Sequence, residues 1–560
     1  MLLFRLVIFS SKAPDEIRRL IRQLQREVPT AKVCGVLYEK KHRKTLPQRL
    51  RLIYSKLSQP GYLGYASREV VRRSMRLSSK LRDGAIRFLH ACPSSVSPPV
   101  AMSLDDLTES LNQLGIESLV VPNMHCAEAL AFVERQRADL GVVFGTGILK
   151  RNLFGIPRLG SINLHKRRLP DYRGGGPVGL WEMLDGRTEV GVTVHKVDDT
   201  LDTGEVLRSA TIPIDDYDDM QSLALKAALI GGDLICGAVR DLANGRERAI
   251  KQPSGGKLFR APSDPQKLAL ENKLRRSRPR YVPKSTRPTW KLLARSVFLL
   301  PFVLVRNWVY RWKKSFPIVI LYHHLITDRP HHLGMPTAEF AKQVEFLQKF
   351  YRIASLEQAM QMLTEHIVTE PTVVLTFDDG YAENAINLRA VTEQYGIPVF
   401  LFVSTAHISD GTPFGHDTKR GQTGFAPLSW DQVISLHRTG FSFGCHTRSH
   451  FDCGSTDVTL LENEIGGSMK DLGERAGIWS PYFSFPWGMP KNMSNEGQAV
   501  ARSHFKYVFA ADGGVNVVGT IPQVALLRRM DHPSRLWEVE LAVQSALNFD
   551  KWRDIFPGVL

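Results

Sequence analysis

A basic, proline-rich stretch in the middle of the chain most constrains its architecture. Between Lys251 and Pro317 there are seventeen Lys or Arg residues and two acidic residues. A single core rarely grows beyond about 250 to 300 residues, so a chain of 560 residues is expected to divide. We therefore predict two folded domains, residues 1–255 and 317–560, joined by a basic linker at 256–316.

The location of the charge weighs against a nucleic-acid partner. The formal charge is +17, and the linker carries nearly all of this excess. A nucleic-acid-binding domain instead gathers its basic residues on one face of the folded domain. We therefore expect no nucleic-acid partner.

The cysteines and the start of the chain indicate a reducing compartment. Six cysteines are scattered without a CxxC pair, and a chain of this size does not need disulfides. The apolar start, Met1 to Ser10, lacks the basic leader and the small-residue cleavage site of a signal peptide, and is typical of a first strand. We expect a cytoplasmic protein with reduced thiols.

The end of the linker has the pattern of a membrane-surface helix. An apolar run from Val297 to Val305 is flanked by basic residues and by Trp290, Trp308 and Trp312. This run is too short to cross a bilayer, which needs about 20 residues. One prediction is a helix at about 290–312 that lies on an anionic membrane surface, at the inner face of the membrane. The alternative is a helix that docks onto one of the two domains.

Both halves of the chain alternate strand patterns with helix patterns. From Leu3 to Phe144 the rhythm is that of an open, mostly parallel α/β sheet of the Rossmann type. From Ile318 to Cys445 the alternation fits a distorted β/α barrel. The predicted fold class is therefore α/β in both domains. Ligands of such folds bind where the strands end, so polar residues after strands are the candidate sites.

The densest polar cluster of the first half lies on one strand and one later loop. Asn163 and His165 are two residues apart, so an extended segment points both side chains to one face. Asp202 lies farther on, in a Leu-Asp-Thr-Gly segment. Formyl transfer to an amine needs a donor for the tetrahedral oxyanion, a base for the amine proton and a group that orients the imidazole. Asn, His and Asp supply these roles, although an isolated Asn-x-His is more often a buried histidine beside a turn.

These segments resemble the folate-dependent formyltransferases, a family that includes methionyl-tRNA, glycinamide ribonucleotide and sugar N-formyltransferases. The resemblance runs from about residue 138 to residue 245 and implies that Asn163, His165 and Asp202 are catalytic. It also implies 10-formyltetrahydrofolate as the formyl donor. The residues expected to contact the folate are Val197, Asp198, Leu201 and Asp202, and Arg173 is a candidate substrate-binding residue.

This chain departs from that family directly after His165. Relatives usually carry a small or apolar stretch there, whereas this chain has Lys166, Arg167 and Arg168. Basic residues beside the acceptor favour a phosphorylated substrate, such as a nucleotide sugar or a lipid-linked phosphosugar. The alternative is that the three side chains are simply solvated.

The second half places acidic residues and histidines after strand-like runs. Asp378 and Asp379 precede a glycine, which by itself is ordinary turn chemistry. His446 and His450 are four residues apart, so in a helical turn both imidazoles reach one cation. One Asp and two His leave open coordination, which lets a metal polarise an amide carbonyl and lower the pKa of water. The other Asp is then free to act as a general base.

This pattern resembles the polysaccharide deacetylases, a carbohydrate esterase family, over nearly the whole second half. The resemblance implies that Asp378 is the base and that Asp379, His446 and His450 bind a divalent metal, with zinc expected. It also implies that Phe485, Pro486 and Trp487 line the substrate groove. Many relatives carry an Arg near this last segment that steadies the base, but Ser484 and Phe485 stand there in this chain. The late general-acid histidine is assigned to His532, with a surface histidine as the alternative.

The two chemistries together predict a bifunctional enzyme acting on amino sugars. It would transfer a formyl group to an amine and hydrolyse an N-acyl group, acetyl or formyl, on a nucleotide-linked or lipid-linked sugar. Two alternatives are a single-activity enzyme in which one half is a degenerate binding module, and a tRNA formyltransferase-like protein.

Overall fold

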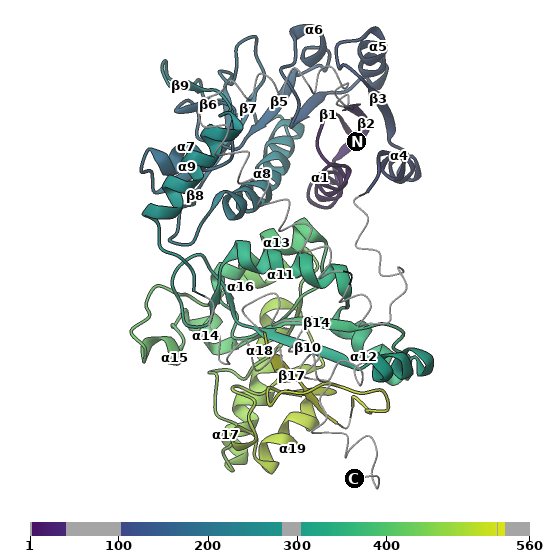
Figure 1. Ribbon diagram of the computed structural model, residues 1–560, viewed down its shortest axis with the longest axis vertical. Coiled ribbons are helices and arrows are strands. Elements are labelled where there is room, and N and C mark those ends of the chain that lie inside the picture. Colours follow the sequence, from purple (N-terminus) through teal and green to yellow (C-terminus); the bar gives the residue numbers. More distant parts are fainter. Residues whose placement is uncertain (1–2, 41–83, 85–101, 283–303, 524, 533–560) are drawn as a thin grey trace. The chain divides into compact units, whose positions relative to one another are not determined.

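The chain forms two compact units that divide near residue 280. The computed structural model describes residues 3–40, 84, 102–282, 304–523 and 525–532. We call the described residues up to 280 unit 1 and those from 281 onward unit 2, leaving Gly84 aside. Figure 1 labels many of their helices and strands.

Unit 1 is built on a seven-stranded sheet in the order β3-β2-β1-β4-β5-β7-β8. The first five strands of this order are parallel, and β7 and β8 are antiparallel additions at one edge (Figure 1). This is the predicted open, mostly parallel sheet. Its strands are β1 (Phe4–Ser10), β2 (Ala31–Glu39), β3 (Glu117–Val121), β4 (Leu140–Phe144), β5 (Ser161–His165), β7 (Glu189–Lys196) and β8 (Val206–Pro213).

Helices cover both faces of this sheet because successive side chains of β1 point to opposite sides. Leu6 and Ile8 join one buried cluster with α1, α4 and α8, whereas Val7 and Phe9 join a second cluster with α5 and α6. The long helix α8 is apolar enough to span a membrane by composition, but most of it is buried inside unit 1, as in a core helix. The helices are α1 (Pro14–Glu27), α4 (Leu104–Gln113), α5 (Ala127–Gln136), α6 (Arg151–Phe154), α7 (Leu180–Leu184) and α8 (Met220–Ala243).

The first part of the segment assigned to the linker is folded onto unit 1. Strand β9 (Lys257–Phe259) pairs in parallel with β6 (Tyr172–Gly174), and the ring of Phe259 stacks on Tyr172 with centroids 5.2 Å apart. Helix α9 (Asp264–Ser277) packs against α7 and contributes the buried Leu274 to a core cluster of unit 1. Proline and basic residues therefore do not prevent short elements here, because a stacked ring and a buried leucine anchor them.

Unit 2 is a parallel sheet that closes on itself almost completely. Its strands follow the order β19-β18-β17-β16-β15-β14-β10-β20. Strands β19 and β20 lie at opposite ends of this order, yet only Arg529 separates them in sequence. One strand interrupted at Arg529 therefore closes the predicted, distorted β/α barrel. The strands are β10 (Ile318–His323), β14 (Thr372–Phe377), β15 (Phe400–Val403), β16 (Ser442–Cys445), β17 (Tyr482–Ser484), β18 (Tyr507–Ala510), β19 (Leu526–Arg528) and β20 (Met530–Asp531), with the short β13 (Arg352–Ile353) beside β14.

Helices lie between the strands of unit 2, as the sequence pattern predicts. The longest among the described residues is α11 (Thr337–Phe350), and α12 contributes to a buried cluster with residues of β10, β14, β15 and β18. The other helices are α12 (Leu356–Thr364), α13 (Asn387–Tyr395), α14 (Thr405–Asp410), α15 (Gly415–Thr418), α16 (Trp430–Arg438), α17 (Val458–Leu461), α18 (Gly467–Ala476) and α19 (Asn495–His504). A parallel pair of two-residue strands, β11 (Leu325–Ile326) and β12 (Gly334–Met335), follows β10.

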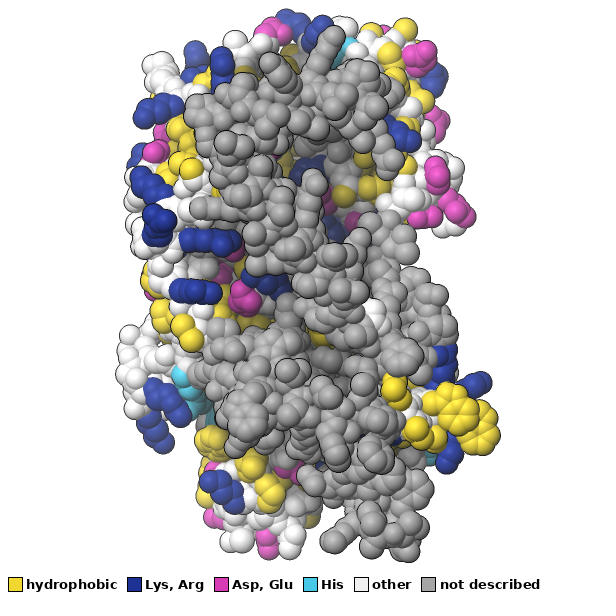
Figure 2. Space-filling view, viewed as in Figure 1, with side chains coloured by type: hydrophobic (Ala, Val, Ile, Leu, Met, Phe, Trp, Pro, Cys, Tyr) yellow, Lys and Arg dark blue, Asp and Glu magenta, His cyan; other side chains and the backbone are white. Residues whose placement is uncertain are grey.

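Residues 304–313 of unit 2 are helical, and the rest of the predicted segment 290–312 lies outside the described residues. One face of this helix is buried, with Asn307 2% exposed and Tyr310 packed on Phe316 at 5.9 Å between ring centroids. The opposite face leaves Val305, Trp308 and Trp312 exposed at 65%, 62% and 73%. Figure 2 shows apolar side chains projecting from the edge of unit 2 beside Lys and Arg side chains.

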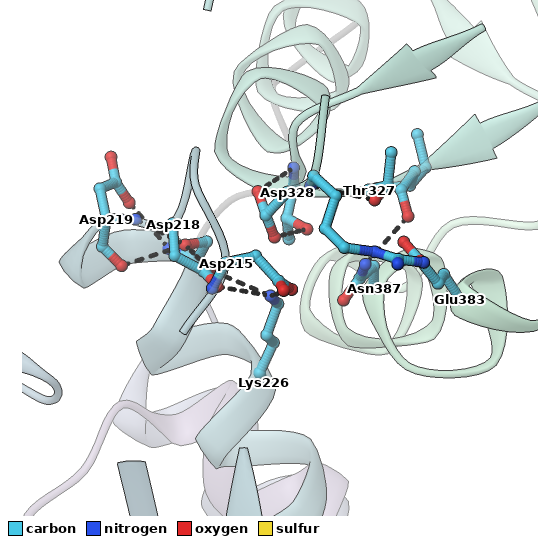
Figure 3. Close-up of polar contacts among 12 residues, drawn as sticks. Asp215, Asp218, Asp219, Lys226, Thr327, Asp328, Glu383 and Asn387 are labelled. Atoms are coloured by element: carbon cyan, nitrogen blue, oxygen red, sulfur yellow. Dashed lines mark hydrogen bonds and ion pairs between the residues drawn. The ribbon is translucent and has the colours of Figure 1, made fainter. Parts of the chain in front are cut away.

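A buried ion pair fixes the start of α8 in unit 1. Lys226 is 2% exposed, and its Nζ lies 2.9 Å from Oδ1 and 3.0 Å from Oδ2 of Asp218 (Figure 3). Oδ1 of Asp218 also accepts a hydrogen bond from the Ser222 hydroxyl. The ammonium group therefore neutralises a carboxylate that has almost no access to water.

Replacing Lys226 with methionine should lower the free energy of unfolding of unit 1 by about 3 to 5 kcal/mol, because the buried Asp218 carboxylate loses an ammonium group that contacts both of its oxygens. Urea unfolding followed by circular dichroism measures this loss. Lys267→Met is the matched control, since Lys267 is 46% exposed in its pair with Glu271. An exposed pair contributes about 1 kcal/mol or less. Equal losses in the two variants would contradict the assignment.

Candidate active sites

Unit 1 brings Asn163, His165 and Asp202 together, as the sequence predicts. Asn163 and His165 lie on β5, and Asp202 lies in the turn between β7 and β8. His165 Nδ1 is 3.6 Å from Asp202 Oδ2. The backbone N–H of Gly174 donates to the same carboxylate oxygen at 2.9 Å. A carboxylate and an imidazole therefore meet at the edge of the sheet where β5 ends.

The hydrogen bonds of His165 define which nitrogen is free to take a proton. Its Nε2 lies 2.7 Å from the carbonyl oxygen of Tyr172, so Nε2 carries the hydrogen and donates it. In the neutral ring, Nδ1 then holds the lone pair and faces Asp202. Burial lowers the pKa of His165, and Asp202 only partly offsets this effect. The ring is therefore neutral near pH 7, ready to accept a proton beside a carboxylate.

A second histidine, His195, completes this site, although the sequence analysis did not select it. Its Nδ1 lies 2.7 Å from the carbonyl oxygen of Lys196, and its Nε2 lies 3.2 Å from Asn163 Nδ2. The tautomer that satisfies both contacts donates from Nδ1 and accepts the Asn163 amide hydrogen at Nε2. His195 therefore sets the orientation of the Asn163 amide. In the antiparallel pairing of β5 with β7, these two residues are direct partners.

The turn that carries Asp202 has a constrained backbone. Asp202 has a φ of 56°, a left-handed conformation that is uncommon outside glycine. A Cβ on Gly204 would lie 1.8 Å from the carbonyl oxygen of Lys196, so only glycine fits at that position. Burial favours the neutral Asp202 carboxyl, but the nearby histidines and the Gly174 N–H hold its pKa below the ordinary value. The turn thus presents an ionised carboxylate to both imidazoles.

The predicted folate residues lie in the same turn, and the predicted substrate residue, Arg173, lies on β6. Val197 packs against the cluster that contains α5 and α6, and Asp198 accepts hydrogen bonds from the Thr203 hydroxyl. Leu201 is 40% exposed, which suits a residue that contacts a ligand. Arg173 lies on β6, where its Nη2 donates to the carbonyl oxygen of Gly256 at 3.2 Å.

The basic run after His165 is engaged mainly with the protein itself. Arg167 is 3% exposed and donates to the carbonyl oxygens of Gly175 and Pro177. Arg168 pairs with Glu189 at 2.9 Å. The third basic residue of the run is Lys166. Burial lowers its pKa to about 8, so it still carries a positive charge at neutral pH. The run therefore gives less support to a phosphorylated substrate than the sequence suggested.

Unit 2 gathers its site at the carboxyl end of the barrel strands. His324, Asp378, His446, Phe485 and Arg529 each follow directly after the last residue of a strand. In a parallel barrel these ends meet at one face, where catalytic residues of such folds lie. Several residues near this face have a left-handed backbone without being glycine: Asp379, Thr447, His450 and Trp487. Such strain clusters at functional sites, because surrounding structure must maintain it.

The predicted metal ligands surround Asp379. His446 Nε2 lies 3.7 Å and His450 Nε2 3.3 Å from Asp379 Oδ1. Asp379 is fully buried, and neither carboxylate oxygen has a hydrogen-bond partner among the described residues. His446 Nδ1 donates to the carbonyl oxygen of Ser484 at 2.7 Å, which leaves its Nε2 lone pair directed at Asp379. A buried carboxylate without donors and free imidazole nitrogens fit a divalent cation such as zinc.

Arg529 holds the predicted base, Asp378, and supplies the arginine that the sequence analysis did not find. Its Nη1 and Nη2 donate to the two Asp378 oxygens at 2.6 and 2.8 Å. Arg529 is fully buried and also donates to the hydroxyls of Thr376 and Ser484. Burial raises the pKa of Asp378, but the Arg529 guanidinium, together with His446 and His324, more than offsets this, so the pKa lies below its ordinary value.

Two family models match the chain. The formyl transferase model matches residues 117–238, which include Asn163, His165 and Asp202. The polysaccharide deacetylase model matches residues 366–504, which include Asp378 and Asp379. The chain joins a formyl transferase domain to a polysaccharide deacetylase domain. The predicted resemblance to these two enzyme families is confirmed.

Individual relatives cover each domain separately. The methionyl-tRNA formyltransferase of Phocaeicola vulgatus is 36% identical over 118 residues, which are 21% of this chain and 36% of that protein. The Synechocystis enzyme of the same name is 36% identical over 128 residues, 23% of this chain and 38% of that protein. The chain thus spans little more than a third of the length of these two relatives.

Solved structures show similarity to each domain. The structure of IcaB from Ammonifex degensii is 22% identical with a TM-score of 0.35, and covers 41% of this chain and 97% of that chain. A sugar N-formyltransferase from a Shewanella species is 15% identical with a TM-score of 0.29, and covers 46% of this chain and 76% of that chain.

The structure places a different histidine from the predicted general acid in the cavity of the deacetylase domain. His532 stacks on His323 with ring centroids 4.2 Å apart, and its Nδ1 lies 3.1 Å from the Tyr322 carbonyl oxygen. Among the described residues, the cavity that holds Asp378 and Asp379 is lined by His324 and not by His532. Phe485 and Trp487 line it as predicted, and Pro486 lies between them.

Proposed function

We propose that this chain is a bifunctional enzyme that formylates an amine in its formyl transferase domain and hydrolyses an N-acyl amino sugar in its deacetylase domain. The observation that carries the proposal is that each domain holds a complete set of reacting groups around one point. Each set includes a base: His165 is neutral beside Asp202, and Asp378 is held ionised by Arg529.

Formyl transfer follows from the geometry of the first set. The amine attacks the formyl carbon of 10-formyltetrahydrofolate, the donor that the family uses, and its proton passes to His165 Nδ1. Asp202, 3.6 Å away, stabilises the imidazolium that forms. The Asn163 amide, oriented by His195, donates to the oxyanion of the tetrahedral intermediate. Val197, Asp198 and Leu201 are proposed to contact the folate.

Amide hydrolysis follows from the second set. Asp379, His446 and His450 would hold a divalent cation, with zinc proposed, and when bound the ion polarises the amide carbonyl and acidifies water. Asp378 accepts the proton of the attacking water. His324 lies in the same cavity and is proposed to protonate the departing amine in place of His532. Trp487, 49% exposed over His450, offers an aromatic surface for a sugar ring.

The proposed substrate is an amino sugar linked to a nucleotide or to a lipid phosphate. Arg420 lines the cavity of the deacetylase domain, and its positive charge favours a substrate with a negative charge near the reacting amide. Because the folate donor is a cytosolic cofactor, we also propose that both reactions take place in the cytoplasm.

We propose that the helix at residues 304–313 lies on an anionic membrane surface. Val305, Trp308 and Trp312 follow helical spacing on one exposed face, and Lys313 and Lys314 are exposed beside it. Tryptophan rings suit the headgroup region, and basic side chains suit anionic lipid. Such a surface would bring the chain to a lipid-linked substrate.

Vesicle sedimentation tests this surface. The chain should sediment with vesicles that contain phosphatidylglycerol and far less with phosphatidylcholine alone. Trp308→Ala together with Trp312→Ala should reduce the bound fraction about tenfold or more, since each ring contributes about 1 kcal/mol or more of burial. Trp479→Ala, an exposed tryptophan on another part of unit 2, is the control and should leave the bound fraction unchanged. Equal binding by all variants would reject this surface.

The function is tested by incubating the purified chain with a panel of amino-sugar nucleotides and 10-formyltetrahydrofolate, with product masses read before and after chelation. Gain of one formyl group identifies the acceptor, and metal-dependent loss of an acyl group identifies the hydrolase substrate. A second candidate is formylation of charged initiator tRNA, since the matched relatives are methionyl-tRNA formyltransferases. Formylated tRNA without any formylated sugar would favour that candidate and overturn the amino-sugar proposal.

A further inference from the structure

A third histidine, His416 on α15, faces the buried carboxylate of the deacetylase domain. Its Nε2 lies 3.5 Å from Asp379 Oδ2. The other two histidines approach Asp379 Oδ1 at 3.3 and 3.7 Å. The ring centroid of His450 lies 5.2 Å from that of His416 and 5.2 Å from that of His446. Three imidazoles therefore surround one carboxylate.

These separations suit ligands that share a cation. Two atoms that each lie about 2.1 Å from zinc at a tetrahedral angle are about 3.4 Å apart. The distance of 3.5 Å between His416 Nε2 and Asp379 Oδ2 matches this spacing and exceeds the usual length of a hydrogen bond. The possible ligand atoms of Asp379, His416 and His450 all lie within 4.8 Å of one another. His416 is thus placed as a ligand rather than as a hydrogen-bond donor to Asp379.

The hydrogen bonds around His416 explain how its nitrogen is held before an ion binds. Tyr381 Oη lies 2.8 Å from His416 Nε2 and 2.8 Å from Asp417 Oδ2. The single hydroxyl hydrogen of Tyr381 goes to the Asp417 carboxylate, so Tyr381 accepts the Nε2 hydrogen of His416. His331 Nε2 donates to the other oxygen of Asp417 at 3.0 Å, and Asp417 is 1% exposed. Tyr381, Asp417 and His331 are therefore positioning residues.

We propose that His416 is a third imidazole ligand of the metal ion in the deacetylase domain. When the ion binds, the neutral ring of His416 changes tautomer: Nε2 gives its hydrogen to solvent and Nδ1 takes one up, so the Nε2 lone pair is free for the cation while Tyr381 keeps its bond to Asp417. The inference rests on the proposed metal-dependent hydrolysis. A site of one carboxylate and three imidazoles favours zinc, cobalt or nickel over magnesium and calcium, which prefer oxygen ligands.

X-ray absorption of the zinc-loaded full chain tests the proposal without any substitution. The outer-shell scattering should fit three imidazoles and one carboxylate around zinc. Two imidazoles at full zinc occupancy would overturn the role of His416 and leave the proposed hydrolysis intact. Failure of the chain to bind one equivalent of zinc would instead reject metal-dependent hydrolysis itself.

Metal affinity in variants gives an independent readout. His416→Ala should raise the Kd for zinc about 10-fold to 100-fold in competition with a chromophoric chelator, with a changed visible spectrum of the cobalt form. His437→Ala is the control, because His437 on α16 bonds the carbonyl oxygen of Phe441 within its own turn. Tyr381→Phe should lower the Kd for zinc or leave it unchanged, because this variant has no hydrogen bond between residue 381 and His416 that must break when zinc binds.

The signs of these effects decide the outcome. If His416→Ala binds zinc with wild-type affinity and the cobalt spectrum is unchanged, His416 is not a ligand. If His416→Ala does not fold by circular dichroism, X-ray absorption of the zinc-loaded wild type decides, because it reports the imidazoles around zinc without any substitution.

Discussion

Replacing Asp202 with asparagine should reduce kcat for formyl transfer about 10³-fold to 10⁴-fold, by analogy with loss of the carboxylate that orients a catalytic histidine. Asparagine keeps the shape of the side chain and an oxygen that accepts the Gly174 N–H. It loses the negative charge beside His165 and His195, at 3.6 Å from each ring. The imidazolium formed during transfer then has no counter-charge in a buried site, and the transition state is disfavoured.

Rates of formylation with saturating donor and acceptor measure this effect. Asp199→Asn is the matched control, because Asp199 lies in the same loop but is 57% exposed and pairs with Arg151. It should behave as the wild type. Amide hydrolysis by the deacetylase domain should be unchanged in both variants. A loss below tenfold in Asp202→Asn would show that the carboxylate does not act on the reacting imidazole.

The elements of the chain follow closely from local sequence patterns. The apolar start of the chain, predicted as a first strand, forms β1 (Phe4–Ser10). Asn163 and His165 meet on one face because a strand alternates its side chains, a rule that needs no partner strand. Asp378 and His446 meet because both follow parallel strands of one barrel. Local sequence periodicity therefore predicts the site residues whose positions depend only on the alternation along a strand or on the point where a strand ends.

The remaining site residues depend on pairings that local patterns do not contain. His195 contacts Asn163 because β7 runs antiparallel to β5, and an antiparallel strand at the edge of a parallel sheet has no signature in its own residues. Arg529 reaches Asp378 across 151 residues of sequence, through closure of the barrel. His416 lies in a long connection between β15 and α16, where periodicity carries no information. The adjacent pair His323 and His324 shows the same limit.

Strand alternation separates His323 from His324, but only the fold shows which one faces the cavity. His323 is buried, stacks on Phe377 and bonds the amide of Gln343. His324 lines the cavity with the two aspartates. Strand alternation points the two side chains to opposite sides of the strand. The packing of α11 against one side decides which histidine is buried and which faces the cavity.

Replacing Arg529 with methionine should reduce kcat for amide hydrolysis about 100-fold or more, close to the contribution of a positioned general base. Arg529 donates hydrogen bonds to both oxygens of Asp378 and is fully buried, so its removal leaves the Asp378 side chain free to rotate. The free energy of unfolding should fall by about 3 to 5 kcal/mol, because Asp378 keeps a buried charge without its partner. Arg528→Met is the control, since Arg528 is 37% exposed and lies 3.8 Å from Asp512.

The pH dependence separates a positioning role from a purely structural one. Arg529 holds the pKa of Asp378 below its ordinary value, so the base stays ionised as the pH falls. Without Arg529 the pKa rises, and the acidic limb of the rate profile of Arg529→Met should move to higher pH. In Arg529→Lys the acidic limb should move by less than in Arg529→Met, because an ammonium supplies charge but not the bidentate contact. A slower variant with an unmoved acidic limb and wild-type zinc content would contradict the assignment of Asp378 as the base that Arg529 holds.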